Sequence, residues 1–187
     1  MQEEVDLVLD VCKEKMGAAV EHLDKELAHI RAGKASPAML DGVLVEYYGS
    51  QTPLNQVSNV STPDARTIAV QPWEKSLIPE IEKAIINANL GLNPDNNGEI
   101  IRINVPVLTE ERRKSLVKQV HNEGEQAKIS IRGARKEAND ELKKLQKDGL
   151  SEDMEKDAED QVQKLTDDFG KKVDTLVDAK EKDILTI

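Results

Sequence analysis

The 187-residue chain has few cysteines and few aromatic residues, and it lacks long apolar runs. Its one cysteine, Cys12, cannot form an internal disulfide, and its place among apolar positions indicates a buried, reduced thiol. No run of about 20 apolar residues exists, and the stretch from Val5 to Val11 is interrupted by Asp6 and Asp10 with no basic segment before it. These features argue against a membrane span, a signal peptide and a transit peptide. They predict a cytoplasmic protein.

The sequence also lacks the motifs of common catalytic sites. It has no Gly-rich phosphate loop ending in Gly-Lys-Ser/Thr, no Gly-x-Ser-x-Gly elbow and no Cys-His pair for nucleophilic catalysis. Glu26 and His29 form the Glu-x-x-His pattern of di-iron bundles, but such a site needs a second copy and two further glutamates. His22 and His121 have no Cys or His partner at metal-ligand spacing. We therefore predict that the protein is not an enzyme and has no catalytic residue, no metal site and no cofactor.

Charge is unevenly distributed along the chain. The whole chain has a formal net charge of −10, yet residues 110–147 carry 11 basic and 7 acidic side chains. An acidic surface repels phosphate, whereas a local basic stripe can still dock on it. Contact with RNA is therefore expected on one face only.

Aromatic residues are 2 % and charged residues 33 % of the chain, which is typical of long helices with narrow apolar stripes. Three stretches place apolar residues three and four apart, as amphipathic helices do. The first ends near Gly33, the second follows Thr109 as an N-cap, and the third follows Ser151. The stripes are Val5, Val8, Cys12, Met16, Ala19, Leu23, Leu27 and Ile30; Leu116, Val120, Gly124, Ala127, Ile131, Ala134, Ala138, Leu142 and Leu145; and Met154, Ala158, Val162, Leu165, Phe169, Val173 and Leu176. Three such stripes can bury one another in an antiparallel bundle, made by residues 1–30 and 108–187.

Residues 35–105 have a different pattern and predict a small domain inserted between the first two helices. Alternation of apolar and polar residues favours strands at 43–48, 52–57, 67–70 and 99–105, with a hairpin turn at Gly49-Ser50. Residues 78–88 have the spacing of a short helix. The fold class is therefore α+β, a discontinuous three-helix bundle with a β/α/β insertion.

Two connections, residues 31–34 and 104–107, join the insertion to the bundle, and we expect a restricted hinge there. Gly33 permits large dihedral changes, whereas Pro106 fixes its own φ and restrains Val105. An ordinary rigid domain boundary is the alternative.

Four segments resemble the signature segments of the bacterial ribosome recycling factor family, in the same order and spacing over nearly the whole chain. They are Arg31-Ala32-Gly33-Lys34-Ala35-Ser36-Pro37, Val45-Glu46-Tyr47-Tyr48-Gly49, Leu90-Gly91-Leu92-Asn93-Pro94 and Leu108-Thr109-Glu110-Glu111-Arg112-Arg113. The resemblance implies an L-shaped monomer, tRNA-like in outline, that binds large-subunit rRNA in the inter-subunit space of the ribosome after termination. With elongation factor G and GTP, such proteins split the ribosome into subunits, and mRNA and tRNA are released.

The resemblance also implies roles for individual residues. The rRNA-facing arginines of the family match Arg113, Arg132 and Arg135, and Lys128 shares a helical face with the last two by its spacing of four and three. Guanidinium groups suit this task because they bind phosphate oxygens in pairs and stay charged. A solvated helix face with local ion pairs is the alternative.

At the hinge, Arg31 and Lys34 match a basic pair of the family, although an arginine is more usual at the position of Lys34. Val107 stands where many members have a second proline after Pro106, which implies a looser hinge.

Three of the four aromatic residues, Tyr47, Tyr48 and Trp73, fall in the insertion. Core packing is one use for these rings, and a patch that faces the GTPase is the other. A function from another class also stays open, namely a coiled-coil scaffold or holdase-like module that self-associates and does not bind RNA.

Overall fold

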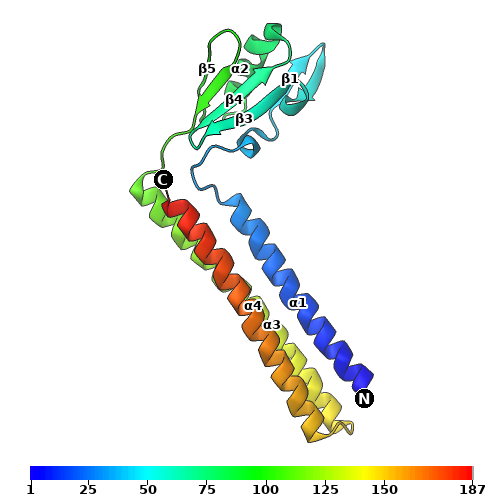
Figure 1. The fold of residues 1–187 in the computed structure, drawn as a ribbon. Helices are drawn as coiled ribbons and strands as arrows, with labels where there is room; N and C mark the ends of the chain where they lie inside the picture. Colours follow the sequence, from blue (N-terminus) through cyan, green and yellow to red (C-terminus); the bar gives the residue numbers. More distant parts are fainter. Residues whose placement is uncertain (187) are drawn as a thin grey trace. The chain divides into compact units, whose positions relative to one another are not determined.

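The computed structural model describes residues 1–186 and shows a mixed fold of long helices and short strands (Figure 1). The chain forms two compact units. One contains Met1–Ala32 and the chain from Glu110 onward, and the other is Gly33–Thr109. The α+β class predicted from the sequence is confirmed.

The first unit is a bundle of three helices. They are α1 (Gln2–His29), α3 (Glu110–Lys147) and α4 (Glu152–Leu185). Helix α1 ends earlier than predicted, because Ile30 already has an extended backbone and caps the helix with its N–H on the Leu27 carbonyl. At the start of α4, the Ser151 Oγ accepts a hydrogen bond from the Met154 N–H at 3.3 Å, so this predicted N-cap is confirmed.

The apolar stripes pack against one another along the bundle. In α3 every predicted stripe residue is buried except Leu145, which is half-buried. In α4 the predicted stripe drifts, because Leu176 is half-buried and Val177 is buried in its place. Helices α3 and α4 run antiparallel, and they approach closely at Gly124, where a Cβ would lie 2.6 Å from Val177 Cγ2.

A short link reverses the chain between α3 and α4. Gly149 has a φ of +114° and the Leu150 N–H donates to the Leu145 carbonyl at 2.9 Å, which is the usual way for a helix to end at a glycine. The predicted antiparallel pairing of these helices follows from this link.

The second unit contains a hairpin, a four-stranded antiparallel sheet and one helix. Its elements are η1 (Pro37–Leu40), β1 (Leu44–Tyr47), β2 (Ser50–Pro53), η2 (Leu54–Gln56), β3 (Ser58–Asp64), β4 (Thr67–Pro72), η3 (Lys75–Leu77), α2 (Ile78–Asn87), β5 (Pro94–Asn96) and β6 (Ile101–Asn104). The sheet order is β3-β4-β6-β5, and β1 pairs with β2 through a turn in which Tyr48 and Gly49 both have positive φ.

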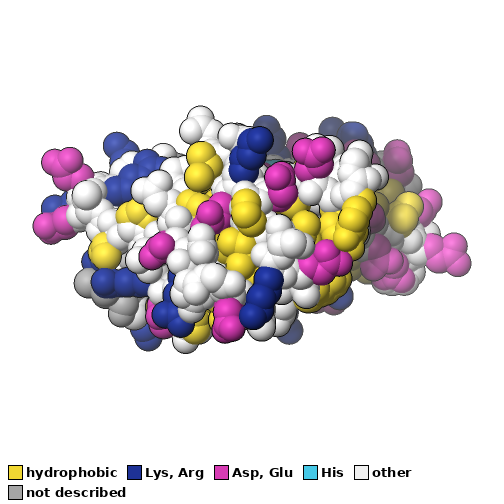
Figure 2. Space-filling model, turned by 90° about the horizontal axis from the view of Figure 1, so that it is seen from above, with side chains coloured by type: hydrophobic (Ala, Val, Ile, Leu, Met, Phe, Trp, Pro, Cys, Tyr) yellow, Lys and Arg dark blue, Asp and Glu magenta, His cyan; other side chains and the backbone are white. Residues whose placement is uncertain are grey.

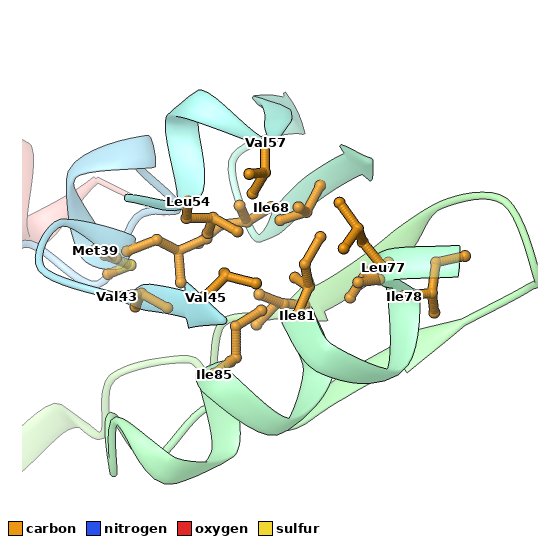
Figure 3. Packing of buried hydrophobic residues seen from close by; sticks show 14 of the residues in the cluster. Met39, Val43, Val45, Leu54, Val57, Ile68, Leu77, Ile78, Ile81 and Ile85 are labelled. Atoms are coloured by element: carbon orange, nitrogen blue, oxygen red, sulfur yellow. The ribbon is translucent and has the colours of Figure 1, made fainter. Parts of the chain in front are cut away.

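The core of this unit lies between α2 and the strands, where aliphatic side chains from both meet (Figure 3). Ile81 and Ile85 of α2 and Val45, Ile68 and Val70 of the strands are fully buried. The helix agrees with the sequence, and the predicted hairpin is present, but its turn lies at Tyr48-Gly49 and Ser50 already belongs to β2. The expected strand at 52–57 is wrong in part, because η2 replaces its second half. Strands β3 and β5 were not predicted.

Candidate nucleic-acid interface

Arg132 and Arg135 form the exposed cationic centre of α3. Both side chains are exposed, and neither takes part in an ion pair within residues 1–186. Between them Gly133 has open space within 4 Å of the position that a Cβ would occupy. Two guanidinium groups three residues apart on one helix can contact neighbouring phosphates, since nothing in the described chain neutralises them.

Lys128, predicted to share this face, is already paired. Its Nζ lies 2.7 Å from Asp174 Oδ1 of α4, and its side chain is half-buried. The hydrogen bond to Asp174 raises the pKa of the Lys128 ammonium above its ordinary value, while the nearby Arg132 acts in the opposite direction. Lys128 therefore lies beside Arg132, as its spacing predicts. Its ammonium stays charged, but Asp174 already balances that charge, so it is less available to a phosphate.

Arg113 lies apart from this pair. It is 19 residues before Arg132 on the same helix, which corresponds to roughly 28 Å along the axis at 1.5 Å per residue. Its side chain is half-buried, and its Nε atom is buried without a hydrogen-bond partner in the described structure. A contact of Arg113 with RNA would thus be separate from that of Arg132 and Arg135.

Ion pairs join α3 to both neighbouring helices. On α4, Asp174 holds Lys128, and Glu181 Oε2 lies 3.1 Å from the Nε2 atom of His121. On the other side of α3, Lys15 of α1 pairs with Glu137. On the face presented in Figure 2, acidic, basic and apolar side chains are interspersed. RNA contact is favoured where Arg132 and Arg135 project, because no ion pair within residues 1–186 balances their charges.

Within the second unit, Ala35 and the predicted hinge residue Val105 are hydrogen-bonded to the turn between β3 and β4. The Ala35 N–H donates to the Ala65 carbonyl at 2.8 Å, and the Val105 N–H donates to the Arg66 carbonyl at 2.7 Å. Asp64 Oδ1 accepts from the Arg66 N–H at 2.8 Å, and this bond, with a further one from Thr67, lowers the pKa of the Asp64 carboxyl. Both connections are thus fastened to one turn of the second unit.

Gly33 and Leu108 pack together in the same region. Gly33 has a φ of +75°, and a Cβ there would lie 2.5 Å from Leu108 Cγ. Pro106 is exposed, as are Val107 and Arg31, whereas Lys34 is half-buried and Val105 is buried. Glycine at position 33 is therefore required by both the backbone and the close approach.

The aromatic side chains of the second unit are mostly on its surface. Tyr48 is 83 % exposed and Trp73 is 68 % exposed, so core packing is wrong for both, while Tyr47 is half-buried. The Tyr47 and Tyr48 rings meet edge to face at 4.5 Å, and both hydroxyls donate to the Glu74 carboxylate, at 3.3 and 3.4 Å. Burial, followed by the charge of Glu74, raises the pKa of Tyr47.

Sequence reasoning did not find Asp174, Glu74 or the turn at Asp64. The sequence does contain a matching spacing: His121 and Lys128 of α3 are seven residues apart, and so are their partners on α4, Asp174 and Glu181. The register that brings them together depends on the α3–α4 link. No three His, Cys, Asp or Glu side chains of residues 1–186 are grouped to hold a metal ion, and no helix in that range is long and apolar enough to cross a membrane.

Comparison with known proteins gives consistent matches. Residues 23–185 match the sequence model of the ribosome recycling factor family. The chain is 57 % identical to the ribosome-recycling factor of Flavobacterium johnsoniae over 187 residues, covering 100 % of both. It is 54 % identical to that of Clostridium perfringens over 185 residues, covering 97 % of this chain and 100 % of the relative.

Two solved structures are also similar. A solution structure of a ribosome recycling factor has a TM-score of 0.73 and 38 % identity, with 98 % of each chain covered. The Thermus thermophilus factor, placed with Escherichia coli elongation factor G on the post-termination complex, has a TM-score of 0.61 and 46 % identity, covering 97 % of this chain and 99 % of that one.

Proposed function

The chain belongs to the ribosome recycling factor family, and on this basis we propose that it recycles ribosomes after termination through the exposed arginines of α3. It binds the post-termination ribosome and, with elongation factor G and GTP, splits it into subunits so that mRNA and tRNA leave. A relative of 46 % identity has been placed on that complex together with elongation factor G, which supports these partners. The proposed place of action is the cytoplasm, where bacterial ribosomes translate.

The observation that carries the RNA contact is the pair of exposed, unpaired arginines, Arg132 and Arg135. In a chain of net charge −10, a polyanion can approach only a local cationic surface. Arg113 is a second, separate contact, and Lys128 contributes once Asp174 gives up its ion pair.

Reversal of one charge tests this contact. Arg132→Glu should weaken sedimentation with 70S ribosomes and leave the helical circular dichroism unchanged, because the side chain is exposed. Loss of one phosphate contact should also flatten the salt dependence of binding by about 0.7 to 0.9 in log–log slope.

Lys164→Glu is the matched control, since Lys164 is exposed on α4 and changes the net charge equally. Equal weakening by both variants would show that overall charge, not the α3 face, governs binding. Sedimentation alone also separates this function from the scaffold alternative, which requires self-association and no ribosome dependence.

The proposed mechanism is mechanical rather than catalytic. Elongation factor G hydrolyses GTP and pushes on the second unit, and the stiff bundle then acts against the contacts between the subunits. Ala35 and Val105 are hydrogen-bonded to the β3–β4 turn and so belong to the second unit. We therefore propose that the chain pivots at Arg31–Ala32 in the first connection and at Thr109 in the second, rather than over the whole of residues 31–34 and 104–107.

A cysteine in each unit, joined by a short bifunctional reagent, should preserve ribosome binding and stop splitting. A long flexible reagent at the same positions should restore splitting. If the short link leaves splitting at its normal rate, the pivot has no role.

The exposed rings of Tyr48 and Trp73 are the proposed contact with the GTPase. Large exposed aromatic side chains are enriched at protein interfaces, and Glu74 holds Tyr48 in place. Trp73→Ala should lower the rate of splitting at limiting elongation factor G with ribosome binding intact, and Trp73→Phe should retain most of the rate. Equal rates of splitting for the Trp73→Ala variant and the native chain would show that Trp73 does not contact the GTPase.

A further inference from the structure

The tip of the β1–β2 hairpin places an aromatic pair against one carboxylate. The rings of Tyr47 and Tyr48 meet edge to face with their centroids 4.5 Å apart, and both hydroxyls donate to Glu74, at 3.3 and 3.4 Å. Glu74 follows β4 along the chain, so the contact joins two separate segments of the second unit. The chain contains no other tyrosine. Both of its tyrosines are therefore gathered around a single acidic group.

Tyr48 is held in solvent in a conformation that is unfavourable for a large residue. Its side chain is 83 % exposed, and its φ of +48° lies in the left-handed region that L side chains rarely adopt. Burial in the core does not offset this cost, because the ring is outside the core. Residues held in such conformations are concentrated at binding and catalytic sites, so the exposed ring is best explained as a contact surface.

No cation balances the carboxylate between the two rings. Glu74 takes part in no ion pair within residues 1–186, and Lys75, the next residue in the chain, pairs with Glu99 instead, at 3.2 Å. The pKa of Tyr47 is raised by burial first and by the charge of Glu74 next, and no cationic group of the described chain acts against them. The half-buried negative charge of Glu74 is thus uncompensated.

The free acceptor positions of Glu74 match a guanidinium group. A carboxylate has about four acceptor positions, and the tyrosine hydroxyls occupy one on each oxygen, Tyr47 on Oε1 and Tyr48 on Oε2. Each oxygen therefore keeps a position for one of the two parallel N–H groups that an arginine presents. The face of an aromatic ring also attracts cations, and arginine takes this place more often than lysine.

We propose that Tyr47, Tyr48 and Glu74 form a receptor for one arginine side chain of a partner protein. The guanidinium group donates to the Glu74 carboxylate and lies against the Tyr48 ring, while Tyr47 keeps the carboxylate and the ring in place. RNA is disfavoured here, because its phosphates would meet the charge of Glu74. The inference deepens the proposed function, on which it rests for the identity of the partner, elongation factor G.

Removal of the charge without a change of shape is the first test. Glu74→Gln keeps an oxygen for the tyrosine hydroxyls but loses the charge, so the concentration of elongation factor G at half-maximal splitting should rise about tenfold. Asp95→Asn, an equal charge change at an exposed position of β5, should raise it less than about twofold. Thermal melts check that both variants stay folded. Equal rises would mean attraction by net charge alone, and no rise for Glu74→Gln would exclude a cation there; either result would overturn the proposal.

A second pair of variants separates a cation on the ring from an apolar contact. Tyr48→Phe keeps the aromatic face, whereas Tyr48→Leu keeps apolar area without such a face, and both keep a side chain at the same positive φ. The half-saturating concentration of elongation factor G should rise about threefold more for Tyr48→Leu than for Tyr48→Phe, which is typical of an exposed cation–π contact. Equal values for the two variants would overturn the stacking of a cation on Tyr48.

Chemical capture identifies the partner group. Tyr48→Cys is labelled with a cysteine-reactive phenylglyoxal, which couples to arginine, and Cys12 stays unlabelled because it is only 2 % exposed. In the complex with ribosomes, elongation factor G and a GTP analogue that resists hydrolysis, mass spectrometry should find an adduct to an arginine of the GTPase. An adduct to rRNA, whose guanines the reagent also attacks, or no adduct in a complex that contains the GTPase, would contradict the proposal.

Failure of the receptor and failure of the proposed function give different results. Trp73→Ala reports on the contact with the GTPase, and Arg132→Glu reports on ribosome binding; neither residue belongs to the receptor. If Trp73→Ala raises the half-saturating concentration while Glu74→Gln does not, the contact with the GTPase stands and the arginine receptor fails. If neither variant changes it, both the receptor and the proposed contact fail.

Discussion

Replacement of Gly124 by alanine should destabilise the bundle, although alanine is the better helix former. The new Cβ would lie 2.6 Å from Val177 Cγ2 and 4.0 Å from Val173 Cγ1. Carbon atoms pack at about 3.5 to 4.0 Å, so the first contact is too short by roughly 1 Å. Val177 cannot easily turn away, because a β-branched side chain in a helix has one strongly preferred rotamer.

The magnitude follows from two opposing effects. Overpacking of this kind costs about 1 to 3 kcal/mol, and the helix propensity of alanine over glycine returns about 1 kcal/mol. The expected net loss is about 1 kcal/mol, or a fall in Tm of about 2 to 4 °C for a chain of this size.

Gly133 on the same helix is the matched control. Nothing lies within 4 Å of its Cβ position, so Gly133→Ala should raise the Tm by about 2 to 4 °C through propensity alone. Thermal melts followed at 222 nm compare the two variants. The double variant Gly124→Ala/Val177→Ala should show a favourable coupling energy of at least about 1 kcal/mol, since the clash is removed. If Gly124→Ala raised the Tm as Gly133→Ala does, the close approach of α3 and α4 would be refuted.

Three further predictions concern charges and backbone. The folded-state pKa of Asp64 is lowered, so its contribution to stability is present above the ordinary pKa of 3.8 and is lost as the pH falls through the lowered value. Asp64→Asn should therefore lower the Tm at pH 6, followed by the fluorescence of the single tryptophan, and the difference should shrink as the pH falls below 3.8; a constant difference would contradict this account. Asp174→Asn should change stability by less than about 1 kcal/mol, because the ion pair is partly exposed, yet tighten ribosome binding at low salt by freeing Lys128, and weaker binding would contradict it. Gly33→Ala should cost the second unit about 2 to 4 kcal/mol in urea unfolding, from a positive φ and a clash with Leu108, and an unchanged midpoint would show that neither operates.

The helices were predictable because their signals are local and long. A stripe such as that of α3 repeats over many turns, and a cap such as Ser151 needs only three further residues. The hairpin of β1 and β2 was predictable for a similar reason, since its turn needs a residue such as Gly49 at positive φ.

The missed strands have a physical reason in common. β3 and β5 are the two edges of the sheet, and edge strands need neither apolar alternation nor a full set of N–H donors. β3 contains Pro63 and β5 begins with Pro94, and proline is unfavourable inside a strand pattern, which weakens the signal of both. Edge position is set by the order of strands in space, and a linear pattern does not contain it.

The candidate site was predictable as residue types but not as partnerships. Spacing along one helix placed Lys128, Arg132 and Arg135 together, yet it could not show that Asp174 of another helix pairs with the first of them. Likewise the composition of the second unit could not show that Tyr48 and Trp73 are exposed, because exposure depends on how the sheet and the turn pack.

The discontinuous bundle has a consequence for folding during synthesis on the ribosome. The apolar stripe of α1 is synthesised first, but its partners begin at Glu110, about 80 residues later, or roughly 4 to 16 s at the usual pace of translation. The second unit is itself synthesised in that interval, and the strand that completes its core, β6, comes last. The nascent first helix, meanwhile, leaves the exit tunnel as an unsatisfied amphipathic segment, and chaperones that bind such segments have their opportunity then.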